Sequence, residues 1–208
     1  SLWASHGKYY DSKSEKWKWQ RPNLFCTNED MFTQTIVVPY LIPMLENAGA
    51  VVFTPRERDW QKEEVIVDND DPVRLPYYTE TTGTRKWQKS PTSGFANTKG
   101  TYSDGDNPFM AGTCRMAQTS KKNPCEISYQ PKFDYEGRHA VYVSYQTVPE
   151  SIDDALYIVY HKGQRTEFHV NQTMGGGTWV YLGTFDFDKG CNEFNRVVVS
   201  NYNKRKGY

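Results

Sequence analysis

The sequence predicts a mixed α+β chain in which an N-terminal βαβ segment precedes an antiparallel β-sandwich. Three observations predict it: an amphipathic stretch over 29–49, short apolar runs on either side of that stretch, and a series of alternating segments after residue 125. We therefore expect a βαβ segment over 1–68, a connecting segment over 69–124 with room for short edge strands, and a sandwich over 125–208.

The first element is a short apolar strand, "LWAS", at 2–5. The stretch "EDMFTQTIVVPYLIPMLENAG" then has apolar residues near helical spacing, with Gly49 as its C-terminal cap and with Pro39 and Pro43 expected to bend the helix. A second strand follows in "AVVFTPRERD". Strand, helix and strand in this order indicate a parallel βαβ unit, whose ligands lie beyond the carboxyl ends of the strands. His6 and the segment 56–59 lie at that edge.

The middle of the chain is dense in Gly, Pro, Asp, Asn and Ser, which is typical of a connecting segment. Two acidic stretches, "DNDDP" at 68–72 and "SDGDNP" at 103–108, contain oxygen ligands suited to calcium. Neither has the D-x-D-x-D-G spacing of a calcium loop, so we interpret both as turns.

The last part of the chain is the most clearly β. Segments such as "HAVYVSYQ", "ALYIVYH" and "NRVVVSNY" alternate β-branched or aromatic residues with polar ones, and "HKGQR" at 161–165 is typical of a hairpin turn. Several antiparallel strands at this spacing predict a β-sandwich. We expect Trp179 to pack in the core, because it alternates with Val180 in one strand.

Composition limits the partners of the chain. Its 25 basic and 25 acidic residues leave no net charge that would favour nucleic acid or an anionic membrane. No apolar run reaches the roughly 20 residues of a membrane span, and no signal peptide is present. Because the chain begins at Ser1 inside an expected strand, we expect that upstream sequence was removed, and an export signal would have been lost with it.

The four cysteines, at 26, 114, 125 and 191, show no C-x-x-C spacing, which argues against a structural zinc site. Pairing of Cys114 with Cys125 stays open, and so does the redox compartment. Aromatic residues make up 15% of the chain. This content fits either a tyrosine-rich sheet or a surface that stacks on sugars.

The β region resembles the golvesin C-terminal-like domain, which also occurs in proteins called xanthan lyases. The resemblance covers about residues 125–201 and rests on a long ordered pattern: Tyr142-Val143-Ser144-Tyr145, Asp154-Ala155-Leu156-Tyr157, His161-Lys162-Gly163, Val170-Asn171-Gln172, Gly175-Gly176-Gly177-Thr178-Trp179, Leu182-Gly183-Thr184-Phe185 and Val197 to Asn201. It implies a β-sandwich accessory module of extracellular bacterial proteins, often supposed to bind carbohydrate. It does not imply lyase chemistry.

The first sixty residues resemble the opening of a zinc-dependent N-acetylmuramoyl-L-alanine amidase. In that family a His-Gly after the first strand and a Glu at the start of the next helix bind the metal, and an Arg-x-x-Asp follows the second strand. The matching positions are His6-Gly7, Glu29-Asp30 and Arg56 to Asp59. The resemblance implies His6 and Glu29 as zinc ligands, with Arg56 and Asp59 in support.

The resemblance to the amidases is incomplete. The family's third ligand, a His, and its catalytic Glu have no matching position, so we assign no catalytic residue. We expect the sandwich to be inserted into the amidase domain after "EVIVDND", and the chain to stop at Tyr208 before that domain resumes. The chain alone should then release no peptide from peptidoglycan, because a metal-bound water needs three ligands and a proton carrier.

Simpler interpretations remain for the individual residues. His6 can be a polar residue that ends a strand, and Glu29 fits the acidic first turn of any helix. Arg56 and Asp59 can form a salt-bridged support. Trp17 and Trp19, in a Lys-rich loop near His6, are the best candidates for a surface that faces glycan.

The leading hypothesis is part of a secreted amidase-like cell-wall hydrolase that needs zinc and carries a golvesin-like sandwich. Its expected partners are peptidoglycan or another cell-surface polysaccharide and the remainder of the amidase domain, without nucleic acid and without a membrane span. Its expected location is extracellular, periplasmic or on the cell surface. The alternative is a non-enzymatic module that binds carbohydrate or protein there.

Overall fold

The computed structural model describes residues 2, 7–11, 13–14, 16–54, 63–71, 76–96 and 107–208. The chain forms two compact units. Unit 1 comprises residues 1–61 and 101–106, and unit 2 comprises residues 62–100 and 107–208. Each unit is described by itself below.

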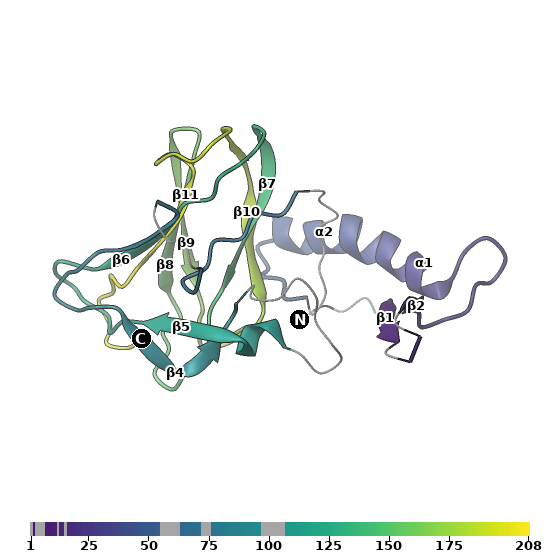
Figure 1. Cartoon of the computed structure of the whole chain (residues 1–208), viewed down its shortest axis with the longest axis horizontal. Coiled ribbons are helices and arrows are strands. Elements are labelled where there is room, and N and C mark those ends of the chain that lie inside the picture. Colours follow the sequence, from purple (N-terminus) through teal and green to yellow (C-terminus); the bar gives the residue numbers. More distant parts are fainter. Residues whose placement is uncertain are drawn as a thin grey trace. The chain divides into compact units, whose positions relative to one another are not determined.

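Unit 2 consists of antiparallel strands, as predicted for the sandwich (Figure 1). A five-stranded sheet has the order β3-β6-β11-β8-β9, formed by β3 (Tyr78–Glu80), β6 (Glu126–Tyr129), β11 (Arg196–Ser200), β8 (Ala155–His161) and β9 (Gln164–Val170). Two further pairs are β7 (Gly137–Ser144) with β10 (Trp179–Phe187), and β4 (Gln88–Gly94) with β5 (Gly112–Met116). A short 3-10 helix, η2 (Pro108–Met110), precedes β5.

The core of unit 2 lies between the five-stranded sheet and the β7–β10 pair. Its centre is Phe133, Val159 and Phe187, which are at most 5% exposed. Partly buried side chains from both layers pack against this centre: Val141, Phe168, Leu182, Phe185 and Val197. Each large apolar side chain that leaves water here contributes roughly 1.5–3 kcal/mol, so this contact is the main reason that the two layers stay together.

Two local features of the sandwich follow from the sequence. The β8–β9 hairpin turns through Lys162 and Gly163, both with positive φ (43° and 74°), which confirms the turn predicted at 161–165. In β10 the register shifts between Tyr181 and Gly183, so that two residues of this strand lie opposite Val141. The bulge lets Leu182 as well as Phe185 reach the core.

The segment predicted as a connection supplies three strands of unit 2. Strand β3 forms the edge of the five-stranded sheet, while β4 and β5 pair with each other. The "DNDDP" stretch forms the predicted turn, since the Asp68 carboxylate accepts the Asp70 N–H at 2.8 Å. Asp70 in turn accepts hydrogen bonds from the amide and the hydroxyl of Thr113, at 2.5 and 2.6 Å, and so fastens this turn to β5.

Unit 1 contains a hairpin and a helix. Strands β1 (Lys8–Asp11) and β2 (Lys16–Trp19) form an antiparallel pair in the segment expected to be a Trp- and Lys-rich loop, so that expectation was wrong. The predicted βαβ arrangement is not confirmed, because residues 51–54 form no strand and residues 3–6 and 55–62 lie outside the described part. Leu2 nevertheless donates a backbone hydrogen bond to the carbonyl of Phe53 at 2.8 Å.

The predicted helix is present and is interrupted at its prolines. It runs through α1 (Glu29–Ile36), a π-helical turn η1 (Val37–Leu41) and α2 (Ile42–Asn47). Pro39 and Pro43 have no N–H to donate to a preceding turn, which accounts for the wider π geometry between them. Gly49, with φ of 88°, follows the helix as the predicted cap.

Candidate functional site

The start of α1 holds three polar residues in distinct roles. Asn28 is the N-cap, and its side-chain oxygen accepts the Met31 N–H at 2.8 Å. Glu29 is exposed at the first helical position, whereas Asp30 is fully buried. Both carboxylates therefore stand near the positive end of the helix dipole, one open to solvent and one closed off from it.

A chain of contacts connects this helix start with the residue after His6. The Gly7 amide donates to the Gln20 side chain, and the Gln20 amide donates to the Gly7 carbonyl, each at 3.1 Å. The next residue, Arg21, donates its backbone N–H to Asp30 at 2.9 Å. The Arg21 guanidinium also lies 3.8 Å from the Glu29 carboxylate. The exit of the β1–β2 hairpin thus links Gly7 to both acidic residues of the helix.

Asp30 has an unused acceptor. Its Oδ2 receives the Arg21 amide, but Oδ1 is buried and has no hydrogen-bond partner among the described residues. A buried carboxylate oxygen without a partner is costly, and a cation or a donor from a ligand would remove that cost. The described residues contain no cluster of three or more His, Cys, Asp or Glu able to hold a metal.

The predicted site residues are described to different extents. Glu29 lies in the contact chain just described, while His6, Arg56 and Asp59 fall outside the described residues. Trp17 is described by its backbone alone, which pairs with Tyr10 in the hairpin, and Trp19 is half-buried opposite Lys8. The contacts of Gln20 and Arg21 and the burial of Asp30 were not predicted. The sequence signal for them was their position directly after the strand "KWKW" and inside the first helical turn.

Two tyrosines of the sandwich are closed to a stacking ligand. Tyr145 and Tyr157 are buried, at 7% and 5% exposure. Their hydroxyls are bonded internally, since Tyr145 donates to the carbonyl of Met174 at 2.7 Å and Tyr157 accepts from Gln172 at 2.9 Å. Stacking on a sugar requires an accessible ring face, so these two rings are structural.

Trp179 packs against other aromatic rings outside the main core, so the expectation that it packs in the core was wrong. Its ring lies 4.8 Å from that of Phe95 and 5.8 Å from that of Phe109. Trp179 is only half-buried, and the neighbouring Val180, at 2% exposure, is the residue that is fully buried. The strand therefore buries both faces, and Trp179 belongs to a second aromatic cluster outside the main core.

The glycine turn before β10 lets its backbone pass close to the backbone that follows β7. A Cβ on Gly176 would lie 2.3 Å from the backbone nitrogen of Thr147, and the Gly177 amide donates to the Tyr145 carbonyl at 2.9 Å. Glycine is needed where two backbones come this close. The turn brings β10 against the end of β7 and is not shaped as a cradle for a ligand.

All four cysteines are free thiols, Cys114 and Cys125 included.

The comparisons with known proteins place the sandwich in a family. The sequence profile of the Golvesin C-terminal domain matches residues 65–208. The chain belongs to this family. A search of curated proteins found no match, and a search of solved structures found none either.

The golvesin domain starts well before the sandwich predicted from residue 125. Its first residue, Val65, lies near the start of unit 2, so the family covers the segment that supplies β3, β4 and β5. The contacts between Asp70 and Thr113 fasten the beginning of the golvesin domain to β5. Residues 1–61 of unit 1, which carry the candidate site, lie outside the match.

Proposed function

We propose that the chain is the sandwich-bearing part of a secreted, zinc-dependent, amidase-like cell-wall hydrolase. Membership of the golvesin family assigns unit 2 to the accessory domains of cell-surface proteins. Among the described residues no helix is long and apolar enough to cross a membrane. Unit 1 would supply the first zinc ligands, His6 and Glu29, and Arg56 and Asp59 would support the segment that follows residue 54.

One observation carries this proposal: the contacts that converge on the helix start of unit 1. The hydrogen bond from Leu2 to Phe53 brings together the segments that lead to His6 and to Arg56. The contacts of Gln20 and Arg21 connect Gly7, the neighbour of His6, with Glu29 and Asp30. These contacts support the proposal because Leu2, Gly7 and Phe53 are close in sequence to the proposed motifs.

Two residue types of the proposed site are suited to zinc. An exposed glutamate at a helix start can bind zinc through a carboxylate oxygen, and a histidine supplies the imidazole nitrogen that zinc prefers. Zinc would polarise the amide carbonyl and lower the pKa of a bound water to about 7. Asp30, whose Oδ1 has no partner among the residues that the structure describes, is next to Glu29 in sequence and is suited to hold a metal ligand in position through a hydrogen bond.

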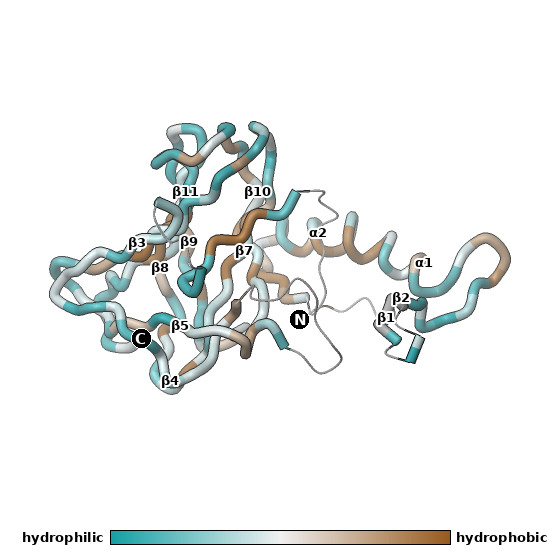
Figure 2. The backbone as a smooth tube through the Cα atoms, in the orientation of Figure 1, coloured by the Kyte–Doolittle hydropathy of each residue, from teal (hydrophilic) through white to brown (hydrophobic). Residues whose placement is uncertain are grey.

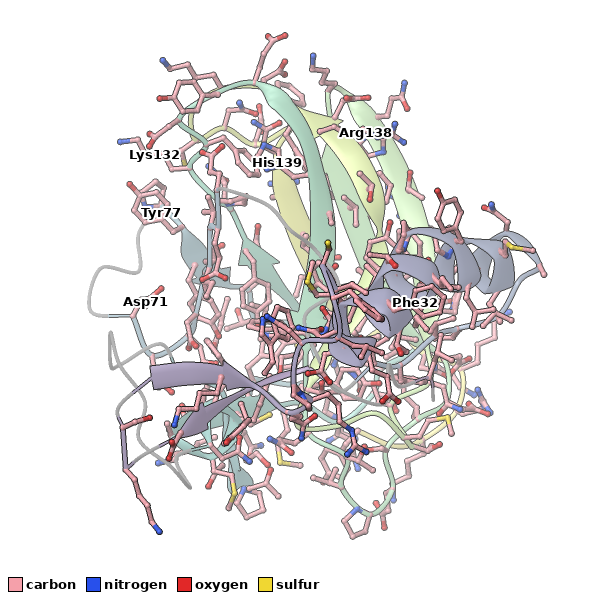
Figure 3. The ribbon with its side chains drawn as sticks, turned by 90° about the vertical axis from the view of Figure 1, so that its right-hand side faces the viewer. Phe32, Asp71, Tyr77, Lys132, Arg138 and His139 are labelled. Atoms are coloured by element: carbon pink, nitrogen blue, oxygen red, sulfur yellow. The ribbon has the colours of Figure 1, made fainter. Side chains whose placement is uncertain are left out.

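The exposed apolar face of the helix in unit 1 supports the proposal that unit 1 is one part of a larger domain. Large apolar side chains recur at every fourth position along it and are exposed: Phe32 by 64%, Ile36 by 47%, Tyr40 by 66% and Met44 by 68%. Figure 2 shows the apolar residues along α1 and α2, and Phe32 is labelled in Figure 3. A helix face of this kind normally packs against a sheet. The remainder of the amidase domain is the proposed cover.

The proposed substrate is peptidoglycan or a related cell-surface polysaccharide. Trp17 and Trp19 lie on the strand that precedes Gln20 and Arg21, the two residues that connect Gly7 with the helix start. Indole rings at the border of a catalytic site suit stacking against a glycan strand. The proposed location is outside the cytoplasmic membrane, where this substrate is found.

Zinc retention by the full chain tests the proposal. Equilibrium dialysis should show one weakly bound zinc per chain, and His6→Ala or Glu29→Gln should weaken binding by at least about tenfold, because each removes a ligand. His169→Ala, in an exposed position of β9, is the matched control and should bind zinc like the parent chain. Equal retention by all four proteins, or loss in the control alone, would contradict the proposal and favour a non-enzymatic module.

A further inference from the structure

Two arginines flank a tyrosine on the outer face of the five-stranded sheet. The register places Arg196 of β11 opposite Tyr160 of β8, and Tyr160 opposite Arg165 of β9. We call these three residues the arginine row. Val159, the neighbour of Tyr160, points into the core, so by strand alternation the row lies on the face turned away from the core.

Arg196 stacks on a tyrosine ring and has no counter-ion among the described residues. Its guanidinium carbon lies 4.6 Å from the centre of the Tyr160 ring, in cation–π geometry. Its Nε is buried and has no hydrogen-bond partner among the described residues, and no described carboxylate forms an ion pair with it. Stacking fixes the plane of the guanidinium, and two further nitrogens remain along its edge as donors.

Arg165 at the other end of the row is partly neutralised. It forms an ion pair with Glu167, two residues along the same strand, and both side chains are exposed by more than 40%. Tyr160, as a hydrogen-bond acceptor, and Glu167 raise the pKa of Arg165. An anion that reached the row would compete with Glu167 for this guanidinium.

We propose that the arginine row binds the carboxylates of an acidic polysaccharide. A planar guanidinium is matched in shape and charge to a carboxylate, which it can hold through two parallel hydrogen bonds. The two guanidiniums project from strands two spacings apart, about 9.5 Å. They can therefore engage carboxylates repeated along a single flat polymer.

A polysaccharide fits this face better than a protein does. The same-face neighbours of the row in β8 and β11, Ile158 and Val198, are apolar but already buried, at 4% and 3% exposure. The neighbours in β9 that remain exposed, Glu167 and His169, are both polar. The accessible surface beside the row therefore lacks the apolar centre that protein interfaces usually have. The inference concerns unit 2 alone and does not depend on the zinc site proposed for unit 1.

Affinity electrophoresis of the full chain through polygalacturonate, dextran or polyglutamate tests the proposal. The parent chain should be retarded by polygalacturonate and not by neutral dextran, and the retardation should decrease with salt. Arg196→Gln should weaken the affinity about tenfold, the usual effect of losing hydrogen bonds to a charged group. Glu167→Gln should strengthen it by about threefold, because it frees Arg165.

Arg138→Gln is the matched control, because Arg138 is an exposed arginine of β7, in the other layer, and is labelled in Figure 3. It should leave the affinity unchanged. Equal affinity of parent and Arg196→Gln, or equal retardation in dextran, would overturn the proposal. Equal retardation by polyglutamate would replace the polysaccharide with an acidic protein. If Arg196→Gln fails to fold, an unchanged affinity in Glu167→Gln overturns the proposal on its own.

Discussion

Three tyrosines of the sandwich have hydroxyl groups that must stay protonated in the folded state. Tyr78, Tyr145 and Tyr157 are buried, and burial raises the pKa of each. For Tyr145 the pKa rises to about 12. For Tyr78 the hydrogen bond to Glu80 adds to the effect of burial. The high tyrosine content of the chain thus serves packing and internal hydrogen bonding in these three cases.

Because of these tyrosines, the sandwich should lose stability in alkaline solution. An unfolded tyrosine releases its proton near pH 10, whereas folded Tyr145 holds its proton to about pH 12, so the folded state binds more protons between these values. The contribution of these tyrosines to the free energy of unfolding should therefore be constant below pH 10 and fall as pH rises from 10 to 12. Thermal unfolding at pH 8, 10 and 11 measures this fall.

Tyr145→Phe should make the fall with pH less steep, although it also lowers stability at neutral pH because Asn171 and Met174 lose a donor. Tyr135→Phe, at a position 71% exposed, is the control. A thermal midpoint that stays constant through pH 11 would contradict this account.

At the scale of elements, local signals predicted most of what the structure contains. The helix was predicted from apolar spacing and from Gly49, and the hairpin turn at Lys162 and Gly163 from turn chemistry, because both depend on neighbours in sequence. The β1–β2 hairpin was missed, since "KYYD" and "KWKW" have few aliphatic residues and the turn between them lacks glycine. Strands β4 and β5 were missed because they are rich in Ser, Thr, Gly and Lys, and pair across a long separation.

The candidate site was predicted to a smaller extent. The capping role of Asn28 and the place of Glu29 follow from local sequence, as does the acidic first turn. The link from Gly7 through Gln20 and Arg21 to Asp30 joins residues that are 13 and 9 positions apart, and only the folded hairpin creates it. No sequence pattern predicts a contact of this kind.

The entry into β10 offers a test of close packing within one element. Gly176→Ala would place a methyl group 2.3 Å from the Thr147 nitrogen and 2.7 Å from its hydroxyl, so the turn or the end of β7 must move. We expect a loss of about 1–3 kcal/mol in the free energy of unfolding of unit 2, as for other overpacked sites. Urea denaturation followed by tryptophan fluorescence measures it.

Gly137→Ala at the start of β7 is the control, because the nearest atom to its new Cβ is 3.8 Å away, on the flexible side chain of His139. Equal stability of Gly176→Ala and the parent chain would show that the turn is not tightly packed. It would reopen the question of whether the three glycines surround a ligand.

At the scale of the whole molecule, the function of unit 2 is inferred from its family, whereas the function of unit 1 is inferred from its structural features. Unit 2 is a golvesin domain with its own core between two layers, and its family membership is the evidence for an accessory role at the cell surface. Unit 1 has an exposed apolar helix face and a buried carboxylate oxygen that no described residue contacts through a hydrogen bond. Both features of unit 1 are explained if it forms part of a larger metal-binding domain.

The coordination shell of zinc bound to the full chain tests the central claim most directly. X-ray absorption spectroscopy at the zinc edge should show only nitrogen and oxygen ligands at about 2.0–2.2 Å, with imidazole scattering that disappears in His6→Ala. Four free thiols are present in the chain as possible competitors. Sulfur scattering at about 2.3 Å, or imidazole scattering that persists in His6→Ala, would contradict the assignment of His6 and Glu29 as ligands.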